Sequence, residues 1–513
     1  METLVPLMVA VPLGVGFAIV AIAHIRGVSR LVGACCVAGV LACLVMALVL
    51  LGGGTVHVYV GGWGPQRTLG IGMVCDGLAK LMLVTINLVA LASVVFATAY
   101  MRRFTRVWLF YALFSLMTAA MNGVVLAGDL FNLFVFLEVA AIASYALVAF
   151  GCEAEELEAA FKYAVLGTVG SAFVLMGVAV LYALTGQLNM AKVAALLPKV
   201  GLSGPGVLLG AGALMAGLAL KAAMVPFHAW LPDAHPSAPA PISAMLSGVL
   251  IKASGVYALA RVVFNVLGGG SHYATILIVL GGVSMLVGVL LAVGQWDFKR
   301  LLAYHSISQM GYVLLALGVG AQVAGSEGVL ARNGVAALCV FGGLYHLFNH
   351  ATFKSLLFLS SGSIEQQTGT RQLKELGGLA RRMPVTSFGC RVGALSIAGV
   401  PPFNGFFSKL IIIVAVALAG RPVLAALAAL VALVTLLSFV KVQRYALEGE
   451  PVAMAAGARE APVAMGSALV VLAIVCLLSG VAMVPLWHYL FEPAGAALLG
   501  GVGKVLSVTG VSP

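Results

Sequence analysis

The sequence predicts an all-α membrane protein with about 14 transmembrane helices, of which the seventh and the twelfth are broken. Two observations support this fold class. The chain of 513 residues is 62% hydrophobic and 9% charged, whereas soluble globular proteins carry about 25% charged residues. Runs of roughly 20 apolar residues, enough to cross a bilayer as a helix, recur along the chain. A membrane β-barrel would instead show short segments of alternating hydrophobicity.

The predicted spans are bounded by polar breaks. To within a few residues, they cover 4–23, 31–52, 72–99, 107–127, 129–150, 159–184, 205–226, 239–264, 273–294, 300–320, 334–362, 384–419 with a break, 422–442 and 463–490. Further apolar runs follow the first one at once. We therefore interpret the first run as a membrane helix and not as a cleaved signal peptide.

Positive charges gather in the loops on one side of the predicted bundle. They are Arg26, Arg30, Arg102, Arg103, Arg106, Lys299, Arg300, Arg371, Lys374, Arg381, Arg382, Lys441, Arg444 and Arg459. The opposite loops hold fewer, namely Arg67, Lys192, Lys199, Arg261, Arg332, Arg421 and Lys504. Because cytoplasmic loops are the richer in Lys and Arg, both termini are predicted to lie outside. An even number of spans agrees with this orientation.

Two breaks that contain proline interrupt predicted spans in similar ways. The seventh span ends in MVPFHAWLPD (224–233), and the twelfth contains VPPFNGFFSK (400–409). A proline inside a span frees backbone groups, which is tolerated where they line protein or water. The breaks lie five spans apart, and an odd shift reverses direction across the membrane. The pattern therefore predicts an inverted repeat of the kind that transporters build around an ion site, with two unrelated proline kinks as the alternative.

This repeat divides the single membrane domain, residues 1–513. We predict N-terminal helices in 1–106, a first repeat in 107–264, a second repeat in 273–442, and a C-terminal helix with its tail in 443–513.

Composition and motif content exclude several classes of function. The net charge of +11 comes from basic residues scattered among short loops, and it does not form the clustered stripe of a nucleic-acid site. The eight cysteines contain no CxxC pair, so we interpret them as packing residues and not as iron–sulfur or zinc ligands. We predict no metal, no cofactor and no catalytic residue, and we place any redox chemistry in another subunit.

Four spans carry an ionisable residue at membrane depth. A charge at the bilayer centre costs at least about 2.5–3.5 kcal/mol, so each one requires a reason. Glu138 lies nine residues beyond Asp129 in the fifth span, which is about 13 Å along a helix and close to the midplane. Lys221 precedes the seventh break, Lys252 lies near the middle of the eighth span, and Lys409 follows the twelfth break.

This combination of one carboxylate and three amines suits a proton relay. Burial shifts the pKa values of carboxyls and amines toward each other, so a Glu–Lys pair that opens and closes can pass a proton. The alternative is a purely structural ion pair between Glu138 and Lys221. Four ionisable groups on four spans favour the relay.

Histidines in two further spans extend the candidate relay. His346, His350 and Lys354 lie at i, i+4 and i+8 of the eleventh span, on one face of a helix. Imidazole, with an ordinary pKa near 6.5, suits transfer between carboxylates and lysines. A zinc site is not predicted, because HxxxH lacks a third ligand and the base of HExxH. A polar packing face is the alternative for these residues, as it is for His305 and Gln309 of the tenth span.

The connection after the seventh break supplies candidates for proton entry. His228, Asp233 and His235 lie in this proline-rich segment, as entry residues or as helix caps, and entry is favoured for Asp233. In the sixth span, Lys162 follows a run of glutamates. Acidic residues favour a helix start, and Glu158 pairs with Lys162 at i, i+4. We keep Lys162 as a further relay candidate.

Five ordered segments resemble the antiporter-like subunits of the complex I and Mrp superfamily. They are DLFNLFVFLE (129–138), LKAAMVPFHAWLPDAHPSAPAPISAMLSGVLIKASGVYALAR (220–261), KRLLAYHSISQMGY (299–312), HATFKSLLFLSSGS (350–363) and GVPPFNGFFSK (399–409). The resemblance covers at least residues 107–442. The variant forms are most similar to Mrp D-type subunits and to their counterparts in membrane-bound energy-converting hydrogenases.

The resemblance implies 14 helices with two inverted five-helix repeats, in a complex with other membrane subunits in a prokaryotic cell (inner) membrane. By motif, it implies that Glu138, Lys221, Lys252, His350, Lys354 and Lys409 translocate protons. Gln309 lies where certain members have a histidine. The function of a relay residue in the tenth span is therefore left open.

Together these features predict a proton-translocating subunit that couples electron transfer in partner subunits to transport of H+, with or without Na+. Protons enter through Lys221 or Lys252 and the Glu138 pair, cross through His350 and Lys354, and leave by Lys409. The chain is then at most a non-catalytic subunit of an oxidoreductase complex. Two alternatives stay open: a D-type subunit of a Na+/H+ antiporter without a redox partner, and a scaffold subunit without a pore.

Overall fold

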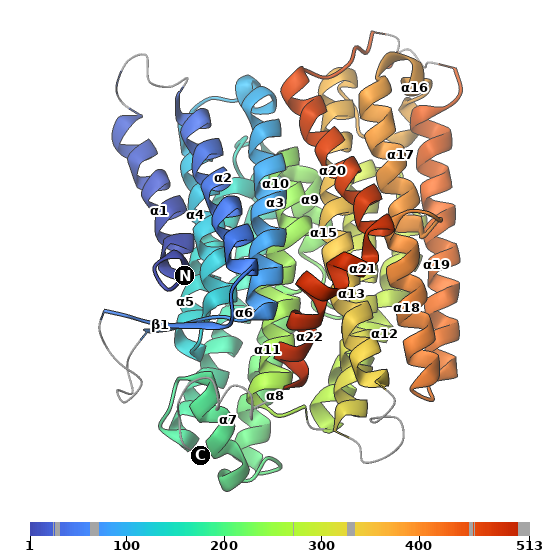
Figure 1. Cartoon of the computed structure of the whole chain (residues 1–513). Helices are drawn as coiled ribbons and strands as arrows, with labels where there is room; N and C mark the ends of the chain where they lie inside the picture. The colour runs from blue at the N-terminus through green and yellow to red at the C-terminus, as the bar shows by residue number, and fades with distance from the viewer. Residues whose placement is uncertain are drawn as a thin grey trace.

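The computed structural model describes residues 1–23, 25, 31–61, 71–269, 271–325, 334–450, 455 and 457–500. Figure 1 shows long helices packed side by side in one bundle, from the blue N-terminal helices on one flank to the red and orange C-terminal helices on the other. Within the described residues, eleven helices are long and apolar enough to cross a membrane. The all-α membrane fold is confirmed, and the number of 14 spans stays a prediction.

The longer helices follow one another through the bundle. In chain order they are α1 (Leu4–Ile22), α2 (Leu31–Leu51), α3 (Gly77–Tyr100), α4 (Val107–Leu126), α5 (Leu130–Val148), α6 (Ala154–Thr185), α8 (Pro205–Lys221), α12 (Ser271–Val293), α13 (Phe298–Ala324), α15 (Val335–Thr368), α17 (Pro384–Ala398), α18 (Asn404–Leu418), α19 (Pro422–Val442) and α20 (Val463–Val481).

Shorter helical segments connect or extend them. They are η2 (Met101–Arg103), α7 (Met190–Val200), α9 (Leu231–Ser237), η6 (Leu373–Glu375), α16 (Leu379–Arg382), η7 (Gln443–Leu447), α21 (Met483–Leu486), η9 (Trp487–Phe491) and α22 (Glu492–Leu499).

The span that carries Lys252 is a continuous buried helix with alternating α and π turns. Its segments are α10 (Ala240–Met245), η3 (Leu246–Leu250), η4 (Lys252–Tyr257), α11 (Ala258–Arg261) and η5 (Val262–Val266). Its most apolar stretch is buried throughout. Lys252 begins one of the π segments, which in proteins occur frequently at functional sites.

Both predicted breaks are present. The helix α8 ends at Lys221 and helical structure resumes at Leu231, while α17 ends at Ala398 and α18 begins at Asn404. At the first break, Trp230 Nε1 donates to the carbonyl of Leu220 at 3.1 Å. The N–H of Val225 donates to Ser284 Oγ of α12 at 2.9 Å. These contacts satisfy backbone groups that the broken helix leaves free. The repeat boundaries 107–264 and 273–442 stay a prediction.

A β-hairpin replaces the start of the predicted third span, 72–99. The strands β1 (Val56–Val60) and β2 (Ile71–Cys75) pair antiparallel, with Val56 opposite Cys75 and Val60 opposite Ile71. Asp76 then caps α3, because its carboxylate accepts a hydrogen bond from the N–H of Ala79 at 2.9 Å. Apolar β-branched residues suit a strand as well as a membrane helix, so hydropathy did not separate the two.

The last predicted span, 463–490, is also too long. The helix α20 ends at Val481, and α21, η9 and α22 follow as separate short segments, drawn in red in Figure 1. Pro485, within α21, has no N–H to continue a helical ladder from the preceding turn.

The bundle has two distinct ends. We call the end with β1 and β2 the hairpin face and the opposite end the α16 face (Figure 1). Of the charges that predicted the orientation, Arg26, Arg30, Arg67, Arg332 and Lys504 lie outside the described residues. Two of the described charges are buried in the bundle. Arg261 and Lys299 are 8% and 1% exposed, and each forms an ion pair with a carboxylate.

Candidate functional site

Glu138 and Lys221 form an ion pair inside the bundle. Lys221 Nζ lies 3.1 Å from Glu138 Oε1. Ser171 of α6 joins them, since it accepts a hydrogen bond from Lys221 at 2.9 Å and donates its own to Glu138. The side chain of Lys221 is 6% exposed and that of Glu138 is 29% exposed. The carboxylate is therefore the more accessible end of this three-residue cluster.

The local structure explains the position of the pair. Asp129 caps α5 by accepting the N–H of Asn132 at 2.7 Å, which places Glu138 more than two turns inside the helix. Lys221 is the last residue of α8 because the non-helical break follows it. The two helices thus bring a carboxylate and an ammonium group together at the end of a half-helix.

A second group of ionisable side chains lies deeper. Lys252, His350, Lys354 and Lys409 are between 0% and 3% exposed. Lys252 donates to the carbonyl of Ser247. Lys409 donates to the carbonyl of Ile397 at 2.7 Å, next to the second break. None of the three lysines has a carboxylate within ion-pair distance in the described part of the chain.

The helix α15 carries three of the predicted residues on one face. The rings of His346 and His350 are 6.5 Å apart. His346 Nδ1 lies 2.9 Å from Ser408 Oγ of α18, and its ring lies 5.7 Å from that of Tyr312. Lys409 Nζ lies 5.3 Å from the same Tyr312 ring. Tyr312 and Ser408 therefore connect the histidines of α15 to Lys409.

Several nitrogens in this group have no hydrogen-bond partner among the described residues. They include both ring nitrogens of His350 and of His305, Nε2 of His346 and Nζ of Lys354. Buried polar atoms in native proteins are nearly always paired with protein groups or ordered water. We call the buried basic residues Lys252, His346, His350, Lys354 and Lys409 the buried row.

A charged cavity, which we call the vestibule, opens at the α16 face. Its volume is about 760 Å³, and its lining includes Glu158, Lys162, Asp233, Asp297, Arg300 and Arg371. Lys162 Nζ lies 3.2 Å from Asp233 Oδ2, and Arg300 Nη2 lies 3.2 Å from Asp233 Oδ1. The side chain of Lys162 is 48% exposed, so this relay candidate lies at the wall of the vestibule.

The two histidines after the first break lie in different surroundings. His228 is partly exposed, and its Nδ1 has no partner among the described residues. His235 is fully buried and stacks on Phe358 at 4.6 Å between ring centroids. Lys354 Nζ lies 5.7 Å from the centroid of the same Phe358 ring. The structure thus brings His235, but not His228, close to the buried row.

Sequence reasoning missed two features. Ser171 is one of many hydroxyl residues in apolar helices, and nothing in its sequence context distinguishes it. Lys299 was counted as a loop charge, but its Nζ lies 2.8 Å from Glu365 Oε2. Arg371 Nη1 lies 3.6 Å from the same carboxylate, beside the vestibule. The i, i+2 neighbours Asp297 and Lys299 were the available signal for a charge network at this helix start.

Comparison with known proteins places the chain in a family. Residues 127–435 match the NADH:quinone oxidoreductase/Mrp antiporter, TM family. The chain belongs to this family. The matched segment contains all six residues of the predicted translocation path.

Relatives in this family include components of two kinds of complex. The chain is 37% identical to the N subunit of NADH-quinone oxidoreductase from Desulforudis audaxviator, over 81% of this chain and 80% of that one. It is 35% identical to the D-type Na(+)/H(+) antiporter subunit of Alkalihalophilus pseudofirmus, over 88% of each. It also superimposes on a chain of the Mrp complex from Dietzia sp. DQ12-45-1b, with a TM-score of 0.86, 30% identity and 97% coverage of both chains.

The hydroxyl of Ser171 provides a test of the ion-pair cluster. Ser171→Ala removes the group that contacts both charges, and we expect proton translocation by the assembled complex to fall about 3–10-fold, or about 0.7–1.4 kcal/mol in the barrier. Ser144→Ala removes a buried hydroxyl from α5 that bonds to Tyr163 instead, and serves as the control. Equal rates for both variants would show that the Glu138–Lys221 pair works without Ser171.

Proposed function

We propose that this chain translocates protons across a membrane as one subunit of a multisubunit complex. The observation that carries the proposal is the combination of the Glu138–Lys221 pair with a buried row of basic groups that has no carboxylate of its own in the described structure. A structural ion pair accounts for Glu138 and Lys221. It does not account for Lys252, Lys354 and Lys409.

Burial of these three lysines supports reversible proton binding. A permanently charged ammonium group in an apolar interior costs several kcal/mol unless it is paired. Each of the three lies within the bundle without a counter-charge, and Lys354 lacks even a hydrogen-bond partner among the described residues. We infer that protons bind to these groups and leave them again.

The proposed path begins in the vestibule. Asp233 and Lys162 lie at its wall, and the Glu138–Lys221 cluster lies at the end of the half-helix α8. When Lys221 moves away from Glu138, the carboxylate loses its counter-charge and takes up a proton. Lys221 then repels a proton toward Lys252 and onward into the buried row.

The row continues along α15 to the second break. His350 and Lys354 have unpartnered nitrogens in the described structure, and groups of this kind bind ordered water that completes their hydrogen bonds. His346 connects through Ser408 and Tyr312 to Lys409. Protons leave from Lys409, while His305 and His228 remain candidate side branches.

We propose redox chemistry in partner subunits as the driving force. A relative at 37% identity is named as a subunit of an NADH-quinone oxidoreductase. Moving one charge through 100 mV is worth about 2.3 kcal/mol, so a modest drop in redox potential is sufficient. The relative named as a subunit of a Na(+)/H(+) antiporter supports a second candidate, exchange of H+ against Na+ without electron transfer. In either version we place both termini outside a prokaryotic cell membrane.

The test is reconstitution of the complete complex into lipid vesicles. A pH-sensitive dye reports proton movement after addition of an electron donor, and separately after a Na+ gradient is applied. We expect movement with the donor alone. Movement with the Na+ gradient alone would replace redox coupling by antiport, and movement under neither condition would support the scaffold alternative.

Lys409→Met tests the exit of the path. We expect translocation to fall at least about 2-fold, or about 0.4 kcal/mol in the barrier, because the row loses its final proton carrier. Lys441→Met is the control, since Lys441 is partly exposed near the end of α19 and bonds to the carbonyls of Val293 and Gln295. An unchanged rate for Lys409→Met would remove this residue from the path.

A further inference from the structure

The hairpin face holds a buried ion pair that the proposed path does not use. Arg261 at the end of α11 donates to Oδ1 of Asp76, the residue that caps α3. The two side chains are 10% and 13% exposed. Arg261 lies about two and a half helical turns beyond Lys252 in the same buried span. The pair therefore stands between the middle of the bundle and its hairpin face.

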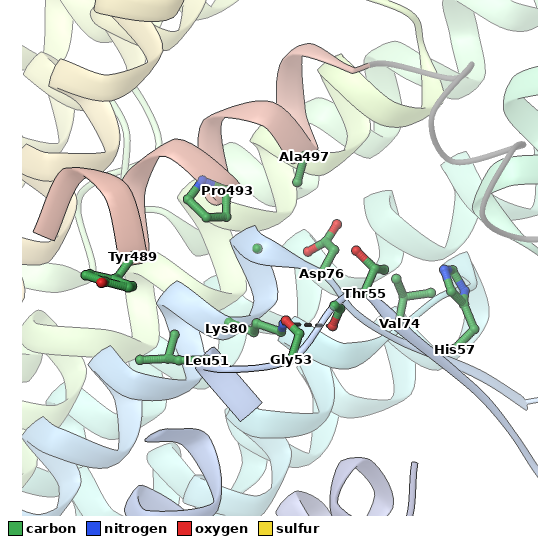
Figure 2. Close-up of a pocket in the computed structure, with 12 residues that line it drawn as sticks. Leu51, Gly53, Thr55, His57, Val74, Asp76, Lys80, Tyr489, Pro493 and Ala497 are labelled. Carbon is green, nitrogen blue, oxygen red and sulfur yellow. Dashed lines mark hydrogen bonds between the residues drawn. The ribbon is translucent and has the colours of Figure 1, made fainter. Parts of the chain in front are cut away.

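Two cavities meet at Asp76. The larger, of about 210 Å³, is also lined by Thr55, His57 and Lys80. Figure 2 shows it between the C-terminal helix, with Tyr489 and Pro493, and the residues of the hairpin and α3. The smaller, of about 40 Å³, is lined by both Asp76 and Arg261. One carboxylate thus borders both cavities.

Arg261 has other partners within reach. Its Nε donates to the hydroxyl of Tyr257 at 3.0 Å, and its Nη1 donates to Asn265 Oδ1 at 3.2 Å. Tyr257 lies one π turn beyond Lys252, and its hydroxyl donates to the carbonyl of Val125 at 2.5 Å. Arg261 makes these two bonds while its Nη2 donates to Asp76, so they still hold the guanidinium if Nη2 leaves the carboxylate.

Two opposing effects act on the carboxyl of Asp76. Burial by itself raises the pKa of Asp76, but the Arg261 guanidinium and the N–H groups of Ala79 and Leu78 bring it below its ordinary value. Without Arg261, the effect of burial gains weight and the carboxyl binds a proton more readily. A small rotation of one side chain thus changes the proton affinity of a group at the cavity wall.

We propose that Asp76 and Arg261 form a gated outlet for protons on the hairpin face, with the larger cavity as its mouth. A proton from the Lys252 side binds the Asp76 carboxylate while Arg261 Nη2 is away from it and the guanidinium is held by Tyr257 and Asn265 alone. Return of Arg261 expels it as a hydronium ion into the cavity, and the guanidinium keeps its own proton throughout. This inference rests on the proposed function, and it adds a second outlet to that at Lys409.

His57 supports the direction of release. It lines the larger cavity, and its Nε2 has no hydrogen-bond partner among the described residues. Burial lowers the pKa of His57, which the charge of Asp76 only partly opposes. The free ring nitrogen at the cavity wall can accept a proton from the cavity and release it again.

A cysteine at the mouth tests the outlet after the complex has assembled. Thr55 is exposed and lines the larger cavity, so Thr55→Cys accepts a membrane-impermeant methanethiosulfonate reagent. We expect this reagent, added on the hairpin side, to reduce protons moved per turnover to half or less. The parent chain, which has exposed Cys35 and Cys152, gives the background. Lys199→Cys, exposed on the same face outside this cavity, is the control.

A paired substitution tests the gate itself. Asp76→Asn together with Arg261→Gln removes both charges, so neither remains unpaired in the interior. We expect the double variant to assemble and to lose the same share of translocation as the blocked cysteine variant. Unaltered transport in the labelled Thr55→Cys complex would overturn the outlet, whether or not the double variant assembles.

Glu138→Gln, assayed alongside, distinguishes the two proposals. If it stops translocation while labelled Thr55→Cys does not reduce it, only the outlet is wrong. If Glu138→Gln leaves translocation intact, the proposed function itself is contradicted, and the outlet that rests on it is contradicted with it.

Discussion

Glu138→Gln is expected to reduce proton translocation by the reconstituted complex at least about 100-fold, or about 2.7 kcal/mol in the barrier. Glutamine has nearly the shape of glutamate and can still hydrogen-bond to Ser171 and Lys221, but it neither carries the charge nor binds the proton. Lys221 then has no carboxylate partner among the described residues. The variant therefore lacks both the group that carries the proton and the negative charge that attracts Lys221.

The measurement is the initial rate of dye response in vesicles that contain equal amounts of assembled complex. Glu448→Gln makes the same change at an exposed position on the α16 face and is expected to translocate at the parent rate. Glu138→Asp keeps the charge but shortens the reach to Lys221, so its rate is expected to lie between those of the parent and Glu138→Gln. Parent-like rates for Glu138→Gln would show that the pair is structural.

The fold was largely predictable because lipid leaves a polypeptide few choices. Backbone groups in a bilayer must pair within their own segment, so apolar runs of sufficient length become helices. Unpaired backbone groups are costly in a bilayer. The prolines at 226 and 401–402 therefore predict breaks whose free backbone groups must pair with neighbouring side chains. Trp230 and Ser284 provide these side chains at the first break. Their role was not visible in the sequence.

The departures have a common physical origin. Hydropathy measures transfer from water and does not distinguish a strand from a helix, so β2 was merged with α3. It carries no signal for the π turns around Lys252. Arg261 was assigned to a loop because it lies near the end of an apolar run, and its partner Asp76 is 185 residues away in the sequence. Partners at such separations follow from packing and not from local pattern.

The sequence names the residues of the candidate site but few of the contacts between them. Because a charge buried in a membrane costs free energy, the sequence identified four candidates one by one: Glu138, Lys221, Lys252 and Lys409. The sequence already suggested the pair of Glu138 with Lys221, which the structure contains, but only the structure leaves Lys252 without a carboxylate. Variants of the two kinds of residue should therefore differ in stability. Removing one member of an ion pair leaves its partner buried without a counter-charge, whereas removing an unpaired charge leaves no such group behind.

Lys252→Met is therefore expected to abolish translocation without weakening the fold. Lys252 is fully buried, and its ammonium group contacts the carbonyl of Ser247. Methionine fills a similar volume and adapts to irregular cores. We expect translocation to fall at least about 100-fold. The free energy of unfolding should stay level or rise by about 1 kcal/mol, because a desolvated charge is removed.

Loss of translocation and retention of stability are checked on one purified complex. The two measurements are the rate of proton movement and the midpoint of thermal unfolding. Lys441→Met, the same substitution at a partly exposed position of α19, should alter the rate of translocation little. A Lys252→Met complex that unfolds at lower temperature and still translocates would mean that the ammonium group anchors Ser247 and the π turn. A complex that is at least as stable as the parent but inactive would mean that the buried charge is retained for transport, since stability alone favours its loss.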